Sequence, residues 1–254
     1  MYTTPVSNAL KELSFLVFGR DCGSDFQETI NTVEKVALMY PNINFQLVVV
    51  DDASERRVTL EIDNNLFEYV DRTYLSKSVG ICGAIINGLK YIKYTKMIWL
   101  PASNMYGAKA ICNLIDFSGS SDLVLGYRSN LTKHRPPIKL FASLLVRGIM
   151  NLSTFHFVAD FKACNLYRTE DVKQWLSPEN SHGGDLVLLV QILLRTEKIV
   201  QVATPINISH NKRASKKFSD NWPSHRAIFS AVKGVLESIR IYRSWNKKIK
   251  KEEL

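Results

Sequence analysis

Short apolar runs alternate along the first half of the chain with segments whose apolar residues recur every three or four positions. The runs, each of which predicts a strand, are Ser14–Phe18, Phe45–Val50, Phe67–Val70, Lys96–Leu100 and Asp122–Gly126. The periodic segments, each of which predicts a helix, are Phe26–Tyr40, a polar stretch after Ser54, Gly80–Tyr94 and Ala108–Phe117. This alternation predicts an α/β domain with a mainly parallel sheet and helices on both faces.

The second half of the chain is less regular but continues the same pattern. After Pro136-Pro137, the expected elements are a helix at Ile138–Leu152, a strand at Phe161–Arg168, a helix at Asp185–Thr196 and an extended run at Lys198–Ile208. No internal repeat and no linker-like stretch divides the sequence before the C-terminal region. We therefore expect one domain over residues 1–222, followed by a helical extension over residues 223–254.

The extension combines basic charge with an apolar stripe. Residues 210–254 contain 12 Lys and Arg against 4 Asp and Glu, which accounts for +8 of the net charge of +9. The stripe predicts one helix over residues 224–250 and consists of Ile228, Val232, Val235, Ile239, Tyr242, Trp245 and Ile249. A basic amphipathic helix is typical of an anionic membrane surface. Packing on the body or in a homodimer is the alternative, and nucleic-acid binding ranks third because no recognised motif accompanies the charge.

Composition narrows the remaining classes. With 46% hydrophobic and 22% charged residues, the chain has the make-up of a soluble globular protein. No apolar run approaches the roughly 18 residues that a membrane-spanning helix needs, and the first residues lack the pattern of a signal peptide. The four cysteines are too scattered for a disulfide framework or a zinc site. We expect a cytoplasmic protein, peripheral on the inner face of the membrane.

Candidate chemistry gathers where the predicted strands end. Ligands of parallel α/β sheets bind beyond the carboxyl ends of the strands, which singles out Asp51, Asp52, the segment after Leu100, and Arg128. A carboxylate there can accept the ring N–H of a nucleotide base, and an arginine can clamp phosphate oxygens. The alternative for the two aspartates is a helix N-cap and turn role, and for the arginine ordinary surface charge.

Several segments resemble, in order, the motifs of family 2 glycosyltransferases with the GT-A fold. Leu47–Ser54 is similar to their V-V-D-D-G-S segment, and Gly80–Gly88 is similar to their G-x-G-x-A-x-x-x-G helix. Further matches are Gly126-Tyr127-Arg128, Asp160, Tyr167-Arg168, Asp185 and the loop His210–Lys216, which is similar to R-x-G-S-K. The matches cover about residues 13–218. The last loop most resembles the branch that transfers sugars to dolichyl or polyprenyl phosphate.

This resemblance implies a nucleotide-sugar donor and an isoprenyl-phosphate or surface-glycan acceptor. It implies nucleotide binding by Asp21, Asp51, Asp52, Ser103 and Asn104. It implies phosphate or acceptor binding by Arg128, Arg213, Ser215 and Lys216. Asp185 is the candidate for orienting the acceptor or acting as a base, with a helix N-cap as its alternative role. Replacing Asp52 with alanine is expected to abolish nucleotide binding with little loss of stability.

The chain departs from the family at the metal-binding motif. The family holds its metal with D-x-D after the fourth strand, whereas Pro101 and Ser103 occupy the two aspartate positions here. Neither supplies the carboxylate oxygens that Mg²⁺ or Mn²⁺ prefers, and Asn104 offers a single carbonyl oxygen. We therefore expect no tightly bound metal or cofactor, and only weak binding of Mg²⁺ or Mn²⁺. Alanines also replace the family's glycines at Ala53 and Ala214.

Three functions follow from these patterns. The first is a hexosyltransferase that handles the donor diphosphate with basic side chains. The second is a catalytically inactive glycosyltransferase-like protein that serves as a binding or scaffold partner. The third is a nucleotide- or nucleic-acid-binding module that uses the basic extension. Binding and turnover of a nucleotide sugar separate the first two.

Overall fold

The protein is described from a computed structural model that carries no ligand. The structure describes residues 10–57, 59–131, 137–154, 156–176, 184–207, 236–237 and 239–244. The predicted acceptor-binding residues Arg213, Ser215 and Lys216 lie outside these ranges, as does the predicted domain boundary at residue 222.

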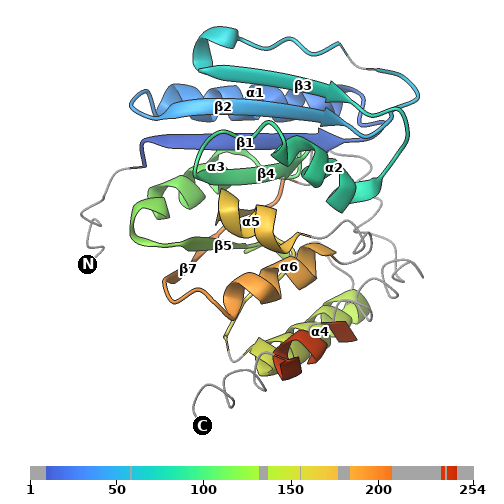
Figure 1. The fold of residues 1–254 in the computed structure, drawn as a ribbon, viewed down its shortest axis with the longest axis vertical. Helices are drawn as coiled ribbons and strands as arrows, with labels where there is room; N and C mark the ends of the chain where they lie inside the picture. Colours follow the sequence, from blue (N-terminus) through green and yellow to red (C-terminus); the bar gives the residue numbers. More distant parts are fainter. Residues whose placement is uncertain are drawn as a thin grey trace.

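A seven-stranded sheet forms the centre of the domain (Figure 1). Its strands are β1 (Glu12–Gly19), β2 (Asn44–Asp51), β3 (Tyr69–Tyr74), β4 (Lys96–Pro101), β5 (Leu123–Tyr127), β6 (Asn165–Arg168) and β7 (Ile199–Ala203). The order is β3-β2-β1-β4-β6-β5-β7. Only β6 runs antiparallel to its neighbours β4 and β5, and every other described pair is parallel. The predicted fold class, a mainly parallel α/β sheet, is confirmed.

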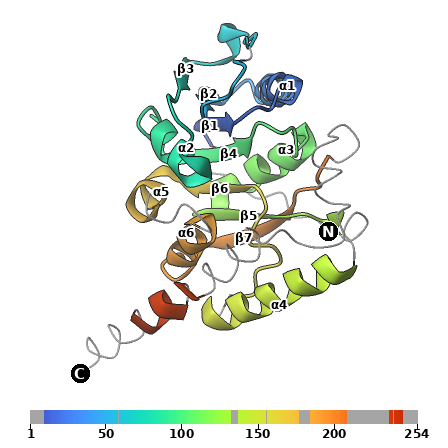
Figure 2. The same cartoon turned by 90° about the vertical axis from the view of Figure 1, so that its right-hand side faces the viewer.

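Helices cover both faces of the sheet (Figure 2). The helices are α1 (Ser24–Met39), α2 (Gly80–Leu89), α3 (Ala108–Asp116), α4 (Pro137–Thr154), α5 (Thr169–Trp175) and α6 (Gly184–Leu193). Figure 2 shows α1 and α3 on one side of the strands and α2, α5 and α6 on the other, with α4 further out beyond β7 and α6. Each side of the sheet has its own buried hydrophobic cluster.

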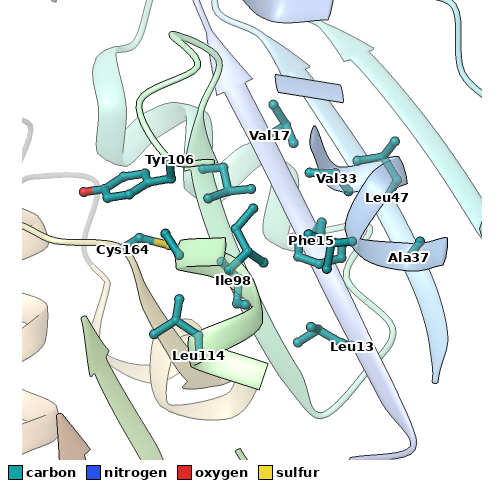
Figure 3. Packing of buried hydrophobic residues seen from close by; sticks show 14 of the residues in the cluster. Leu13, Phe15, Val17, Val33, Ala37, Leu47, Ile98, Tyr106, Leu114 and Cys164 are labelled. Carbon is teal, nitrogen blue, oxygen red and sulfur yellow. The ribbon is translucent and has the colours of Figure 1, made fainter. Parts of the chain in front are cut away.

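The helices on both faces of the sheet explain why β1 and β2 are continuous apolar runs. Residues 13–18 and 45–51 are buried throughout, because side chains pointing to either face meet a helix layer, and such strands read as continuous apolar runs. Figure 3 shows Phe15 and Leu47 of the strands packed with Val33 and Ala37 of α1. A polar pair interrupts the apolar pattern, since Ser14 Oγ donates to Gln46 Oε1 at 2.8 Å inside the sheet. The buried hydroxyl is therefore satisfied across neighbouring strands.

Two expectations about secondary structure are wrong, and one helix was not predicted. The polar stretch after Ser54 forms no α-helix among its described residues, only the 3-10 turn η1 (Asn64–Leu66). Side chains of α1 hold this stretch away from a helix, because Gln27 bonds both the N–H and the C=O of Glu61, and Glu34 accepts from the N–H of Asp63. No helix or strand is predicted for Thr169–Trp175, which form helix α5. The strand expected at Phe161–Arg168 begins only at Asn165.

The C-terminal extension is described over eight residues. Residues 236–237 and 239–244 are helical, in agreement with the predicted helix over that stretch. Ile241 and Tyr242 pack partly buried against the cluster on the α2–α5–α6 side, whereas Leu236 is exposed. Of the predicted stripe, Ile239 and Tyr242 are described, and both are half-buried; the other five positions lie outside the described residues. At this point, therefore, the extension contacts the body.

Candidate functional site

The carboxyl ends of β1, β2 and β4 bring two predicted segments together. The backbone N–H of Asp52 donates to Gly19 O at 2.9 Å, and that of Ala102 donates to Phe18 O at 2.7 Å. A Cβ atom on Gly19 would lie 2.7 Å from both Ala102 Cβ and Cys22 Sγ, so only glycine allows this close approach. Asp52 and the 101–104 turn therefore flank the end of β1 at one edge of the sheet.

The loops at this edge hold backbone conformations that most residues avoid. Asp21, Ala53 and Asn104 have φ values of 50°, 60° and 48°, and they follow β1, β2 and β4 respectively. They are all of the non-glycine residues with positive φ in the described part of the chain. Asp and Asn tolerate this region better than alanine, which has no polar group to compensate. Strain of this kind clusters at functional sites, where the surrounding structure holds it in place.

Asp21 and Asp51 tie the first two loops to each other. The N–H of Ser54 donates to Asp51 Oδ1 at 2.8 Å, and Ser54 Oγ accepts from the N–H of Asp21 at 2.8 Å. Asp21 Oδ1 accepts in turn from the N–H of Glu55 at 2.8 Å. Asp51 is buried, and in the described part of the chain its hydrogen bonding uses Oδ1 alone. Oδ2 is therefore the oxygen with which Asp51 could accept from a ligand.

Asp52 caps helix α2. Its carboxylate accepts from Val79 N at 2.7 Å, from Gly80 N at 3.0 Å and from Ser78 Oγ at 2.8 Å. These N–H groups belong to the start of α2, where the helix itself supplies no acceptor. Of the two roles considered for Asp52, the structure shows the capping role. The three bonds also contradict the expectation that removing this carboxylate costs little stability.

The turn after β4 contains a buried amide oxygen without a partner. Asn104 is 7% exposed, and its backbone N–H donates to Thr29 Oγ1 of α1 at 3.0 Å. Its side-chain Oδ1 has no hydrogen-bond partner among the described residues. A buried carbonyl oxygen left unpaired costs about 1–3 kcal/mol, so such an atom calls for an explanation. Ser103, the neighbouring predicted residue, is half-buried.

The donor atoms at this turn do not suit a divalent cation. Pro101 and Ser103 replace the carboxylates that the family resemblance implies, and Asn104 Oδ1 is a neutral oxygen. Among the described residues, no group of three or more His, Cys, Asp or Glu side chains gathers as a metal site would require. Mg²⁺ and Mn²⁺ prefer carboxylate and water oxygens. The side chains of this turn therefore do not fit a tightly held Mg²⁺ or Mn²⁺.

Arg128 is bound to a carboxylate inside the domain. Its Nε lies 2.6 Å from Asp160 Oδ2 and its Nη2 lies 2.8 Å from Asp160 Oδ1, with the two side chains 7% and 12% exposed. Burial alone would raise the pKa of Asp160, but the hydrogen bonds and charge of Arg128 outweigh it, and the pKa is lowered. Arg128 lies at the carboxyl end of β5, as predicted. A phosphate would meet an arginine whose charge Asp160 already balances.

Asp185 begins helix α6 and lies close to α2. Burial raises the pKa of the Cys82 thiol to about 11, the Asp185 carboxylate raises it as well, and the backbone amides of Asp185 and Gly184 oppose this. These interactions place the start of α6 beside the first turn of α2, which Asp52 caps. Asp51, Asp52, Ser103 and Asp185 thus belong to connected elements around the carboxyl end of β1. Arg128 follows β5 at the same edge, because two antiparallel steps through β6 restore the direction of β4.

Three supporting contacts are not predicted from the sequence, although Asp160 itself is one of the residues that match the family motifs. Thr29, Ser78 and Asp160 hold Asn104, Asp52 and Arg128 respectively. The serine is the only one with a local signal, since Ser-x-Gly before an apolar helix is typical of an N-terminus. Thr29 and Asp160 act across 75 and 32 residues, so no spacing rule finds them.

The fold of this chain is similar to that of several solved structures. A mycobacterial protein matches with a TM-score of 0.54 at 12% identity, over 89% of this chain and 75% of that one. Weaker matches are S. aureus TarS 1–349 (TM-score 0.48, 16% identity, 76% of this chain) and the mannosyltransferase PcManGT from Pyrobaculum calidifontis (0.47, 9%, 94%). The matches span 59% of TarS 1–349 and 78% of PcManGT. No protein-family model matches the chain, and neither does any curated protein.

Proposed function

We propose that this chain is a glycosyltransferase with the GT-A fold that takes its sugar from a nucleotide-diphosphate donor. Within that class we propose a hexosyltransferase whose acceptor is an isoprenyl phosphate or a surface glycan. The observation that carries the proposal is that Asp21, Ala53 and Asn104, all with positive φ, lie in the loops after β1, β2 and β4, at the edge of the sheet where buried Asp51 ends β2. A mainly parallel sheet binds ligands at this edge, so the strained loops and the ligand site coincide.

The nucleoside is assigned to the loops after β1 and β2. Asp51 Oδ2 accepts the ring N–H of the base, while Ser54 and the Asp21 loop hold Asp51 in orientation. Asp52 acts through α2, whose N-terminus it fixes beside the site. Asp52 is therefore a positioning residue, and Asp51 is the residue that contacts the nucleotide.

The donor diphosphate is assigned to the turn after β4. Ser103 supplies a hydroxyl group that can donate to a phosphate oxygen, whereas the unpaired Oδ1 of Asn104 is an acceptor and suits a hydroxyl group of the nucleotide sugar. Arg128, Arg213, Ser215 and Lys216 are assigned to the phosphate and the acceptor, the last three from outside the described residues. Basic side chains then carry the charge that a metal carries in the family, because the turn lacks carboxylates. Weak binding of Mg²⁺ or Mn²⁺ remains compatible with this assignment.

The acceptor is assigned to the side of the site where α6 begins. If the acceptor is a phosphate, it is already a nucleophile at neutral pH and needs little general-base help. Asp185 then orients the acceptor, and for a hydroxyl acceptor it would take the proton. We propose a cytoplasmic protein, peripheral on the inner face of the membrane, whose basic extension contacts anionic lipid. Among the described residues no helix is both long and apolar enough to cross a bilayer.

One observation favours the second candidate function, a catalytically inactive binding or scaffold protein. The turn that carries carboxylates in the family carries Pro101 and Ser103 here. A protein of that class would bind a nucleotide sugar without turning it over. Binding and turnover must therefore be measured separately.

Calorimetric titration with a panel of nucleotide sugars tests the proposal. UDP-GlcNAc and GDP-Man are suitable first ligands, each with Mg²⁺, with Mn²⁺ and with EDTA. We expect one donor to bind, with an affinity that changes little on adding EDTA. Asp51→Asn should weaken that binding by about 10- to 100-fold, the range for losing a hydrogen bond to a charged group.

A matched control is Asp122→Asn, which removes an exposed carboxylate before β5 at the opposite edge of the sheet. It should leave the affinity unchanged. Equal affinities for both variants would show that Asp51 does not hold the base. Nucleotide release on adding polyprenyl phosphate separates an active transferase from an inactive binding protein, and no binding of any donor would refute both.

A further inference from the structure

The outer face of α4 exposes a row of large apolar side chains. Those residues, with their exposed fractions, are Ile138 (52%), Phe141 (70%), Leu144 (44%), Leu145 (57%) and Leu152 (77%), followed after the helix by Phe157 (77%). Positions 138, 141, 145 and 152 recur at helical spacing and share one face. Single exposed apolar residues are ordinary, but a contiguous patch of this kind marks a docking surface.

The inner face of the same helix is packed against the body. Met150 and Thr154 are buried, and Val146 packs against the cluster on the α2–α5–α6 side. These three positions lie on the face opposite Phe141 and Leu145. Figures 1 and 2 both show α4 at the outer end of the molecule, where the C-terminal helical stretch also lies. The helix is therefore held in place with one apolar face inward and a second apolar face outward.

The charge around this face is mostly positive, although Glu237 lies 3.9 Å from Arg240 and Asp160 balances Arg128. From Tyr127 to Ala159 the sequence contains five Lys and Arg and no Asp or Glu. Exposed Arg240 and Arg243 belong to the C-terminal helical stretch, which packs through Ile241 and Tyr242 on the same cluster as Val146. An apolar face framed by basic residues is complementary to a surface with anionic headgroups over hydrocarbon.

We propose that the outer face of α4 is a docking surface for an anionic lipid bilayer, with Phe141 and Leu145 entering its interfacial region. Attachment is thereby assigned to a helix within the domain, in addition to the basic extension. A second copy of the chain is the poorer occupant, because self-pairing would bring two segments without acidic residues face to face. The apolar side chains supply affinity for any bilayer, and the basic residues supply the preference for anionic lipid.

Vesicle co-sedimentation with matched double variants tests the proposal. Phe141→Asp/Leu145→Asp alters two α4 residues that are 70% and 57% exposed, and Leu38→Asp/Met39→Asp alters two α1 residues that are 66% and 57% exposed. Both lower the net charge by the same two units, so the difference between them reports the α4 face. With vesicles of phosphatidylcholine and phosphatidylglycerol, we expect the α4 variant to lose at least about tenfold in partitioning, and the α1 variant to lose less than about threefold.

The outcomes are distinct. Equal losses in the two variants would show that net charge alone governs binding and would overturn the proposal, as would absence of wild-type binding to these vesicles. A wild-type dimer that the α4 variant converts to a monomer, without vesicle binding, would identify a second copy as the occupant instead. Phe141→Ser, which adds no charge, repeats the test if the double variant does not fold. None of these readouts needs a nucleotide sugar, so they stand whether or not the chain is a transferase.

Discussion

The carboxyl edge of the sheet has two halves that are built by different means. The loops after β1, β2 and β4 contain the three non-glycine residues with positive φ in the described chain, held by hydrogen bonds to backbone N–H groups. At the end of β5 no described non-glycine residue has positive φ, and a buried ion pair joins Arg128 to Asp160. The first half is held by backbone conformation and hydrogen bonds, and the second is held by one buried ion pair.

The two halves should respond differently to the loss of a single interaction. A strained loop depends on many bonds around it and tolerates the loss of one. A buried ion pair depends on two groups, and losing one leaves the other charged in an apolar interior. Substitutions in the two halves should therefore differ in how much stability they cost.

The largest effect is expected from breaking the buried pair. Arg128→Met leaves the Asp160 carboxylate buried without its partner and should lower the free energy of unfolding by about 3–5 kcal/mol in urea titrations. The control is Arg168→Met, which removes a half-exposed partner of Asp171 and should cost no more than about 1 kcal/mol. The double variant Arg128→Met/Asp160→Leu should recover most of the loss. If the two single variants are equally stable, the second half is not held by charge.

A smaller loss is expected from the cap of α2. Asp52→Ala removes the acceptor for Val79 N and Gly80 N and should lower the free energy of unfolding by about 2 kcal/mol. Asp51→Asn keeps an oxygen for Ser54 N and should cost less than about 1 kcal/mol. Thermal and urea unfolding of both variants measures the contrast. Equal costs would mean that the two neighbouring carboxylates share one structural role.

A gain in stability is expected at the strained alanine. Ala53→Gly removes the Cβ from a residue at φ 60° and should raise the free energy of unfolding by about 1 kcal/mol. Ala110→Gly in the middle of α3 is the control and should lower it by about 1 kcal/mol or more. If Ala53→Gly is destabilising too, the loop after β2 stores no strain and the contrast between the halves fails.

Protonation of Asp160 is expected to have the smallest effect on the free energy of unfolding near neutral pH. The pKa of Asp160 is lowered in the folded chain, so its contribution is complete above its ordinary value of about 3.9 and declines as pH falls below that value toward the folded pKa. The wild-type chain should therefore lose stability relative to Arg128→Met/Asp160→Leu between about pH 5 and pH 3, and hold it between about pH 6 and pH 8. Parallel urea titrations at these pH values provide the measurement. A constant difference down to about pH 3 would mean that the pKa of Asp160 is not lowered in the folded chain, because the unfolded chain takes up its proton at about pH 3.9 in either case.

The fold could be predicted wherever burial imposes a period on the sequence. Strands β1 and β2 are covered on both faces and read as apolar runs, and α1 shows its buried face as Phe26, Ile30 and Val33. The stretch after Ser54 could not be predicted, because side chains of α1 determine it from 29 to 34 residues away. Helix α5 has seven residues, too few to show a period. Local sequence patterns therefore predict the elements that are buried in the core, and they do not predict segments whose conformation depends on side chains far away in the sequence.

The candidate site shows the same division. The carboxylates at the end of β2 could be found from the strand pattern, and the structure places them at the predicted edge. Their separate contacts could not be found, because Asp51 bonds within its own loop while Asp52 reaches 26 to 28 residues ahead to α2. The pairing of Arg128 with Asp160 depends on where the chain returns after α4, which no spacing rule gives.

The position of β6 has a consequence for how the chain folds. Strands β1 to β4 form a continuous block that needs only residues 12–101, whereas β4 and β5 are joined only through β6, four residues that arrive more than 60 residues after β4. Long-range pairings of this kind slow folding, because the loop must close before its contacts form. We expect the first block to gain protection from hydrogen exchange early during refolding. The strands β5 and β7 should become protected together, at the moment when Asn165–Arg168 are inserted between the two blocks.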